Sequence, residues 1–280
     1  MRAFKFMTFA IAGSALLVAG PAVAQDAQDW SGPYIGAHAG YSFLDEDDGE
    51  RVGFDTNLDG AFNDTVRNVG GADVFSPGFC DGANLSNNAP AGCKDDEGVL
   101  DAGLRAGYDV SYNGFVLGVV GEVSSVSIND SVTAFTTTPA GYSYKRSLDT
   151  LYALRARVGA PIGSYLVYGT AGVAFGDIER EFNTTNGLNS FTSRGGDDGQ
   201  GYQVGAGVER RVSGTPFSIG AEYLYTSLDD EGYVVNFGRG GAAATHPFVL
   251  VNPAGTDTRR EDDTLDLQSV RVTVAYRFGG

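Results

Sequence analysis

The chain has 280 residues, and its 35 acidic and 19 basic side chains give a formal net charge of −16. Because nucleic acids are bound by basic surfaces, this balance argues against a nucleic-acid-binding protein. The 41 glycines, 14 tyrosines and 17 phenylalanines, with only 9 prolines, favour closely packed, curved β-strands over helices.

The first 24 residues are organised like a secretory signal peptide. A cationic start (Arg2, Lys5) precedes an apolar run over 6–19, and an A-x-A-like cleavage site ends at Ala24. The apolar run is too short for a transmembrane helix, and no later segment is long and apolar enough for one. We therefore expect an exported mature protein with a single domain over 25–280, which is periplasmic, secreted or a membrane β-barrel.

Eight segments of the mature chain alternate between apolar and polar residues. After the second, fourth and sixth segments the chain reverses within four residues that are rich in Gly, Asn and Ser. After the first, third, fifth and seventh come long polar stretches. Short turns on one side and long loops on the other are typical of an outer-membrane barrel. The predicted strands are 33–43, 98–110, 115–126, 148–160, 165–176, 201–212, 217–228 and 266–278.

The last strand shows the alternation most clearly. Val270, Val272 and Val274 share one face, and Arg271 and Thr273 share the other. A period of two with one consistently apolar face predicts strands that face lipid on one side, and aromatic residues near both strand ends predict two interfacial belts. The fifth segment is small and apolar on both faces, so its faces cannot be assigned. The alternative is a soluble exported β-sandwich with the aromatic residues in its core.

The ends of the predicted barrel resemble a known family. The residues Trp30–Gly36 that open the first strand, and Val270–Phe278 that close the last, resemble the small outer-membrane β-barrel or "porin-family" surface proteins of alphaproteobacteria, which are related to the OmpA-like transmembrane barrel. The likeness covers the strands but not the loops. The family usually ends on the aromatic residue, whereas Gly279 and Gly280 follow it here.

This resemblance implies an all-β fold, an eight-stranded antiparallel up-and-down transmembrane β-barrel with four long extracellular loops. It implies residence in the bacterial cell outer membrane, with outer-membrane lipid and lipopolysaccharide as surroundings. It also implies that the barrel-assembly machinery reads the C-terminal strand.

Charged side chains of both signs fall on the polar faces of the strands. They should face the lumen, because Arg exposed to lipid at mid-depth costs ~2–4 kcal/mol. The interior of an eight-stranded barrel is about filled by side chains, which favours a plug of ion pairs; the alternative is a narrow pore that selects ions or carries protons. The predicted luminal charges are Arg105, Glu122, Arg155, Arg157, Glu209, Arg211, Glu222 and Arg271.

The first long loop, 44–97, carries 13 acidic and 3 basic residues. Its segment 55–60 follows the D-x-N-x-D-G start of a calcium-binding loop, but Val66 stands where the bidentate Glu would be, so a solvated Asx-Gly turn is the plainer interpretation. We expect the acidic cluster 45–50 to bind divalent ions loosely beside lipopolysaccharide, and we expect no other cofactor. The candidate calcium ligands are Asp55, Asn57, Asp59 and Asn63.

Cys80 and Cys93 lie in the same loop of an exported chain, where a disulfide is the natural interpretation and no His lies nearby for a zinc site. Catalysis has little support. His38 and Ser42 share the polar face of the first strand, but roughly 13 Å of strand separates them, too far for proton transfer. We expect His38 to be a hydrogen-bonded luminal residue and the protein not to be an enzyme.

Together these features predict a non-enzymatic outer-membrane surface protein. Its barrel would help to hold the envelope together, and its loops would meet ions, ligands or host surfaces. One rival hypothesis is a channel of low conductance. Another is an adhesin or ligand receptor that acts through the loops 44–97 and 229–264. The sequence identifies no loop ligand and no oligomeric state.

Overall fold

The computed structural model describes residues 29–44, 49–196, 198–230 and 232–278. The expected signal peptide, residues 45–48 of the acidic cluster and the terminal glycines lie outside the described residues. Two three-residue 3₁₀ helices occur in the described part, η1 (Ala89–Ala91) and η2 (Pro247–Val249). Within that part, no helix has the length and hydropathy needed to cross a membrane.

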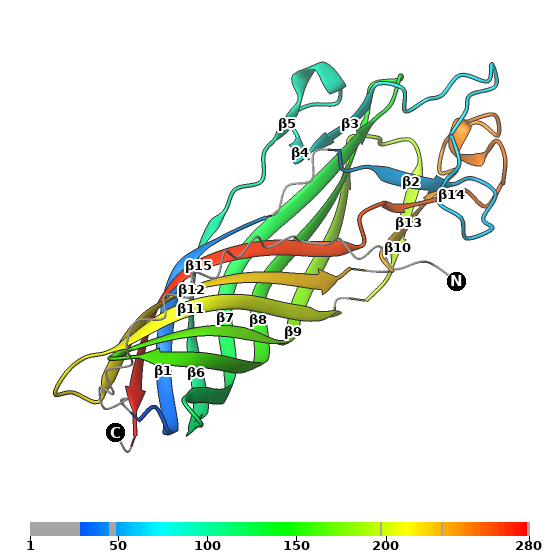
Figure 1. The fold of residues 1–280 in the computed structure, drawn as a ribbon. Helices are drawn as coiled ribbons and strands as arrows, with labels where there is room; N and C mark the ends of the chain where they lie inside the picture. The colour runs from blue at the N-terminus through cyan, green and yellow to red at the C-terminus, as the bar shows by residue number, and fades with distance from the viewer. Residues whose placement is uncertain (1–28, 45–48, 197, 231, 279–280) are drawn as a thin grey trace, which may run out of the picture.

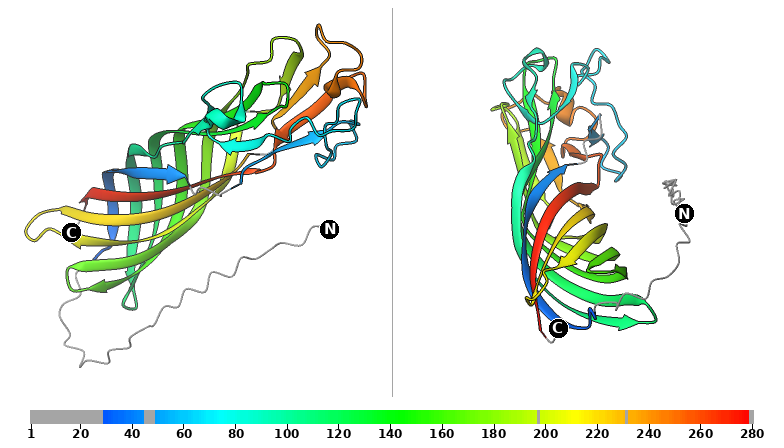
Figure 2. Two further views of the ribbon diagram at one scale, coloured as in Figure 1. Left: turned by 90° about the horizontal axis from the view of Figure 1, so that it is seen from above. Right: turned by 60° about the vertical axis from the view of Figure 1, so that its left-hand side comes forward.

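Eight strands form a closed antiparallel ring (Figures 1 and 2). Each pairs with the next ring strand along the chain, and the last returns to pair with the first over Leu44 to Tyr34. A closed ring satisfies its backbone amides internally and leaves no exposed edge, as a lipid environment requires. The prediction of an eight-stranded barrel is confirmed. The ring strands are β1 (Gly32–Leu44), β6 (Val99–Tyr112), β7 (Phe115–Phe135), β8 (Gly141–Ile162), β9 (Tyr165–Thr184), β11 (Asp198–Arg211), β12 (Phe217–Asp229) and β15 (Thr264–Arg277).

The two faces of the ring differ in polarity as the alternation predicts. Val270 and Val272 on β15 are 55% and 62% exposed on the outside, whereas Arg271 between them is fully buried in the lumen. In β9, which the sequence left unassigned, Leu166 and Tyr168 point inward and their neighbours point outward. The outer surface of the barrel therefore carries an apolar belt, and the buried charges of the strands point into the interior.

Three strands extend well beyond the predicted boundaries. β7 and β8 continue into a hairpin that turns at 136–140, where the sequence predicted a long loop from 127 to 147, and β9 continues to Thr184. The predicted strand ends are wrong here. The pairing shifts register between Ser125 and Ile128, and Ser127 has a φ of +50°. This bulge interrupts the alternation, so the polar residues beyond it resemble loop sequence.

The extended hairpins carry a second sheet, which forms a folded head at the end of the barrel opposite the short turns (Figure 1). The sheet has the order β10-β13-β14-β2, with strands β10 (Ser190–Arg194), β13 (Val234–Gly238), β14 (Thr256–Arg260) and β2 (Val52–Asp55). Beside it, β3 (Gly78–Asp81) pairs with β7, and β4 (Ala83–Asn84) pairs with β5 (Cys93–Lys94).

The head has a hydrophobic core of its own. Phe54 of β2, Phe237 of β13 and Tyr142 of β8 are buried in one cluster, and their rings pack at centroid distances such as 5.2 Å between Tyr142 and Phe237. A second cluster around Leu148 and Leu265 separates this core from the charged lumen. The long polar loops of the sequence are therefore largely one packed structure.

Candidate functional site: the charged lumen and the neck of the head

The first luminal cluster lies near the short turns. Arg157 Nη1 donates to Glu209 Oε2 at 2.9 Å and Nε donates to Asp109 Oδ1 at 2.8 Å. Arg277 bridges the same two carboxylates at 2.8 and 2.7 Å. Each arginine also lies over the Tyr34 ring, at 5.0 and 4.7 Å. Two cations and two anions thus neutralise one another in a buried, aromatic-walled layer.

The second cluster occupies mid-barrel. Glu122 receives hydrogen bonds from Arg155 at 2.9 Å and from Arg271 at 2.5 Å. Arg155 and Arg105 reach Glu222 at 3.5 and 3.4 Å. Three arginines therefore oppose three carboxylates, the third being that of Asp101, which lies 3.1 Å from Arg271.

A glycine makes one of these pairs possible. Gly40 of β1 lies between Asp101 of β6 and Arg271 of β15 in the strand register. A Cβ on Gly40 would come within 2.6 Å of the Arg271 Cγ. The missing side chain lets the arginine cross β1 to reach its carboxylate, so the luminal ion pair depends on Gly40 as well as on the charges.

All eight predicted luminal charges are buried, but they do not form one set. Arg211 donates to the backbone oxygen of Asp29 at 2.6 Å and lies 5.9 Å from the Trp30 ring centroid, at the short-turn end. Sequence reasoning left out Asp101, Asp109 and Arg277. Their positions on the polar faces of their strands were the signal that could have included them. A buried charge needs a partner. Without Arg211, the two luminal clusters hold five arginines and five carboxylates.

His38 lies beside the mid-barrel cluster, and its hydrogen-bond partner is Ser124, not Ser42. Its Nε2 is 3.2 Å from Ser124 Oγ on β7, while Ser42 donates to Asp101 at 2.5 Å. The sequence could not show the Ser124 contact, because it crosses strands. Ser124 is 1% exposed and His38 4%, so a substrate has no access to this serine–histidine pair in the closed barrel.

The candidate calcium ligands of the first loop mostly bind their own backbone. Asp55 accepts the N–H groups of Asp59 at 3.1 Å and Gly60 at 2.7 Å, and Asp59 accepts that of Ala61 at 2.8 Å. This is the geometry of an Asx turn, which holds the loop without an ion. Asn63 makes no hydrogen bond to these groups in the described structure. Calcium binding here stays a prediction.

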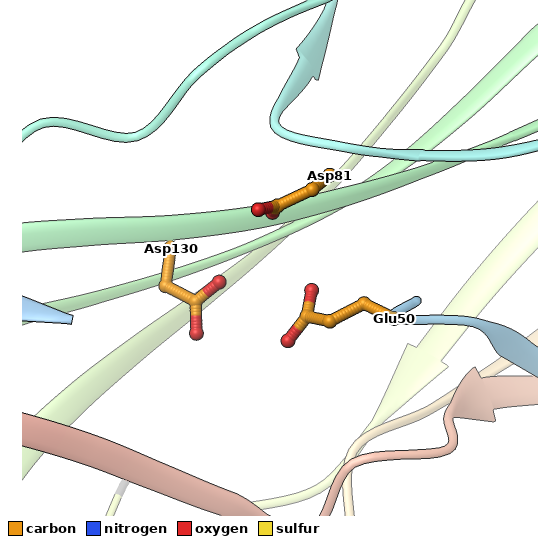
Figure 3. Close-up of side chains that lie close together, drawn as sticks. All are labelled: Glu50, Asp81 and Asp130. Carbon is orange, nitrogen blue, oxygen red and sulfur yellow. The ribbon is translucent and has the colours of Figure 1, made fainter. Parts of the chain in front are cut away.

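The structure places a different acidic group at the neck, where the barrel meets the head. Ligand oxygens of Glu50, Asp81 and Asp130 lie within 4.8 Å of one another (Figure 3). Arg260 pairs with Glu50 and, at 2.9 Å, with Asp130, and Arg146 donates to Asp130 at 2.6 Å. Arginines therefore already compensate much of this charge, so the group resembles an ion-pair network more than a cation cage.

The neck network continues across three extended strands. Arg146 also reaches Asp230 at 3.0 Å and Asp262 at 2.9 Å, and Arg180 of β9 reaches Asp230 at 2.5 Å. The sequence did not suggest this network, because Asp130 and Arg146 fell in the stretch predicted as a loop. Their register, directly opposite one another in the hairpin, is what brings them together.

Two neck carboxyls have strongly shifted proton affinities. Burial raises the pKa of Glu50 to about 7, against the lowering effect of Arg260. Burial also raises the pKa of Asp96 to about 7, although its carboxylate accepts the Ser131 N–H at 2.6 Å. Burial acts in the same direction on Asp130, but Arg260 and Arg146 outweigh it and hold that pKa below its ordinary value. Glu50 and Asp96 therefore hold a proton more tightly than a free carboxylate does, whereas Asp130 holds one less tightly.

The first loop, 44–97, also contains a disulfide. The structure joins Cys80 and Cys93 by a disulfide with a Cα–Cα distance of 6.0 Å. The bond ties β3 to β5 beside the extended edge of β7. It therefore fixes the outermost part of the first loop onto the barrel extension.

Comparison with known proteins agrees with this architecture. The family model "Outer membrane protein beta-barrel domain" matches residues 12–278. A 31 kDa outer-membrane immunogenic protein of Brucella melitensis is 27% identical over 214 residues, 72% of this chain and 73% of that protein. A 22 kDa outer membrane protein of Rhizobium leguminosarum bv. viciae is 35% identical over 86 residues, 31% of this chain and 36% of that protein.

Among solved structures, the attachment invasion locus protein Ail of Yersinia pestis, crystallised with the heparin analogue sucrose octasulfate, aligns over 88% of this chain and 99% of its own. The identity is 11% and the TM-score is 0.32. The family match spans the whole barrel and almost the whole chain, and the relatives from Brucella and Rhizobium are named as outer-membrane proteins. The chain belongs to the outer membrane protein β-barrel domain family and resides in the bacterial outer membrane.

Proposed function

We propose that this protein is a non-enzymatic surface protein whose barrel anchors and supports the envelope and whose head recognises ligands outside the cell. The observation that carries the proposal is the packed aromatic core of the head, around Phe54, Tyr142 and Phe237. A surface that is ordered before binding loses less entropy on association than flexible loops do. A barrel whose only role was to sit in the membrane would not need a packed head.

The paired charges in the lumen favour a closed barrel that serves as an anchor over an open pore. Five arginines and five carboxylates meet in two buried layers across its width. An ion that entered would have to displace paired charges, each of which costs several kcal/mol to leave uncompensated. We therefore expect the wild-type protein to give no discrete current steps in planar lipid bilayers.

The recognition role is tested by shortening the loops 44–97 and 229–264 to brief turns. Cells that display the wild-type protein are expected to adhere to host-cell monolayers or polysaccharide-coated plates, and the shortened variant to lose this adhesion while its barrel stays heat-modifiable on gels. A Gly-Ser insertion in the short turn 213–216 is the matched control and should leave adhesion unchanged. Equal adhesion of cells with and without the head would contradict the proposal.

A narrow channel is the second candidate, and one observation favours it. In the described part of the chain, Arg155 Nη1 and Arg271 Nη2 are buried and make no hydrogen bond. Groups of this kind are usually satisfied by buried water, and a file of such water could conduct protons. Reproducible current steps in the bilayer that change when Arg155 is replaced by Met would establish this function in place of the closed anchor.

The C-terminal strand supports a further part of the proposal, assembly through the barrel-assembly machinery. The rings of Tyr276 and Phe278 pack edge to face at 4.8 Å on the outside of β15. This aromatic pair stands at the end of an alternating strand, where the machinery would read it. The variant F278A is expected to reach the outer membrane in smaller amounts than the wild type.

A further inference from the structure

A cavity of about 530 Å³ lies in the head, where all four loops meet. Its walls come from Asn68 and Val74 of the first loop, from 136–140 and Tyr142, and from the segments 185–188 and 246–248. The volume is in the range of small-ligand sites, roughly 300–1,000 Å³. A larger hollow of about 690 Å³, beside Leu104, belongs to the outer apolar belt, whereas the cavity in the head lies among the loops.

The lining of this cavity carries no formal charge. Among the residues that the structure describes, no Asp, Glu, Lys or Arg lines it, although the chain has 54 such residues (35 acidic and 19 basic). A charged ligand enclosed here would lose water without gaining a partner of opposite charge, which is costly. The site therefore selects against ions, phosphates, sulfates and carboxylates, and favours an uncharged ligand.

Two kinds of side chain line the cavity. One kind carries hydroxyl, amide or imidazole groups, which donate as well as accept hydrogen bonds. The other kind is apolar, and among its rings the buried Tyr142 and Phe248 pack edge to face at 5.7 Å. The polar residues are Asn68, Thr137, Thr138, Thr185, Asn186 and His246, and the apolar ones include Val74 and Pro247.

Hydrogen bonds between the loops fix these walls. Asn186 Nδ2 donates to Tyr142 Oη at 2.9 Å, which joins the third loop to the β7–β8 hairpin. The Thr137 N–H donates to the Val74 oxygen at 2.8 Å, which joins that hairpin to the first loop. Because these contacts are made within the chain, the loops themselves order the site, and binding costs less entropy.

His246 adds a donor to the wall. Its Nδ1 accepts the Phe248 N–H at 3.4 Å, and its ring packs against the Phe248 ring at 4.9 Å. This arrangement places the ring proton on Nε2, the atom left for a ligand. Burial lowers the pKa of His246, so the ring is neutral at pH 7 like the rest of the lining.

We propose that this cavity binds a neutral saccharide. A sugar ring has an apolar face, which suits the accessible apolar lining at Leu188 and Pro247. It also has a rim of hydroxyls that both donate and accept, which suits the Thr and Asn side chains. A peptide ligand is disfavoured, because the walls at 136–140 and 185–188 are turns and offer no strand edge for backbone pairing. This inference rests on the proposed recognition role of the head and gives that role a ligand class.

The test uses the full-length protein in a zwitterionic detergent and saturation-transfer NMR with maltotriose, cellotriose, chitotriose and lactose. Sialyllactose and a sulfated disaccharide serve as charged probes, and an uncharged tripeptide as the alternative ligand. We expect at least one neutral sugar to bind and the charged probes and the peptide not to bind. Binding of the charged probes or the peptide alone, or of no probe at millimolar concentration, would overturn the proposal.

The double variant T137V/T138V removes two hydroxyls from the wall and conserves side-chain volume. It should weaken sugar binding at least about fivefold, since each hydrogen bond contributes ~0.5–1.5 kcal/mol. T192V, on exposed β10 away from the cavity, is the matched control. Unchanged binding by the double variant would place the sugar elsewhere and overturn the inference. If head-dependent adhesion persists while no sugar binds, the inference fails and the proposed function stands.

Discussion

Glu122 is the residue whose loss should most disturb the lumen. The substitution E122Q keeps the shape of the side chain but removes the charge that Arg155 and Arg271 share at 2.9 and 2.5 Å. The mid-barrel cluster then holds three arginines and two carboxylates. Removing one member of a buried ion-pair network costs about 3–5 kcal/mol, so we expect E122Q to lower the free energy of unfolding by about that amount.

Unfolding by guanidinium in lipid vesicles measures this loss, because the single tryptophan, Trp30, is fully buried and its emission reports on the barrel. E181Q, an exposed carboxylate on β9, is the control and should change stability by less than about 0.5 kcal/mol. In the double variant E122Q/R271M the charges balance again, and it should recover at least about 1 kcal/mol of the loss. If E122Q lowers the free energy of unfolding no more than E181Q does, the stability of the barrel does not depend on the paired luminal charges, and the prediction is refuted.

Three further predictions concern packing, pH and the disulfide. A Cβ on Gly107 would lie 2.4 Å from the Tyr34 ring, so G107V should sharply reduce the heat-modifiable folded fraction on gels. The raised pKa of Glu50, about 7, means that the folded head holds this proton more tightly than the unfolded chain does, so the head should lose stability as pH rises from about 4.5 to about 7. This loss should shrink in E50Q, as followed by protease resistance at each pH. Reducing the disulfide should destabilise the first loop by roughly 3 kcal/mol and speed amide exchange in 78–97 without changing that of the barrel.

Distinct results would contradict each of these. The control for G107V is G187A, whose added methyl group meets nothing within 4 Å. If G107V yields as much folded barrel as G187A does, the Tyr34 ring does not need the space that Gly107 leaves. If the protease resistance of E50Q and of the wild type changes with pH in the same way, Glu50 is not the group whose titration destabilises the head. Exchange that speeds up equally in the barrel and in 78–97 after reduction would show that the disulfide does not act locally.

The barrel could be predicted because its strands alternate with a period of two, with lipid on one side and the charged lumen on the other. Val270, Arg271 and Val272 show this alternation within one strand, so it can be recognised without knowing which strands are paired. The closed ring of strands followed from this pattern and the short turns. The identity of the ion pairs did not, because the pairing of Asp101 with Arg271 depends on the register of two strands on either side of Gly40.

The head could not be predicted for a related reason. Its strands are short, and its core residues, such as Phe54, Phe182 and Phe237, come from segments far apart in the sequence and separated by acidic and glycine-rich turns. Locally these segments resemble loops. The bulge near Ser127 further breaks the alternation at the point where β7 leaves the barrel. Only the packing of four loops against one another makes them ordered, and it also creates the cavity.

Hydrogen–deuterium exchange on the protein in lipid vesicles tests the central claim most directly, namely that the four loops form one folded head on a closed barrel. The amides of β13 and β14, which pair only with strands of the head, should exchange slowly, on a time scale approaching that of β12 and β15. Exchange of β13 and β14 at the rate of an unfolded chain, beside a protected barrel, would contradict the account.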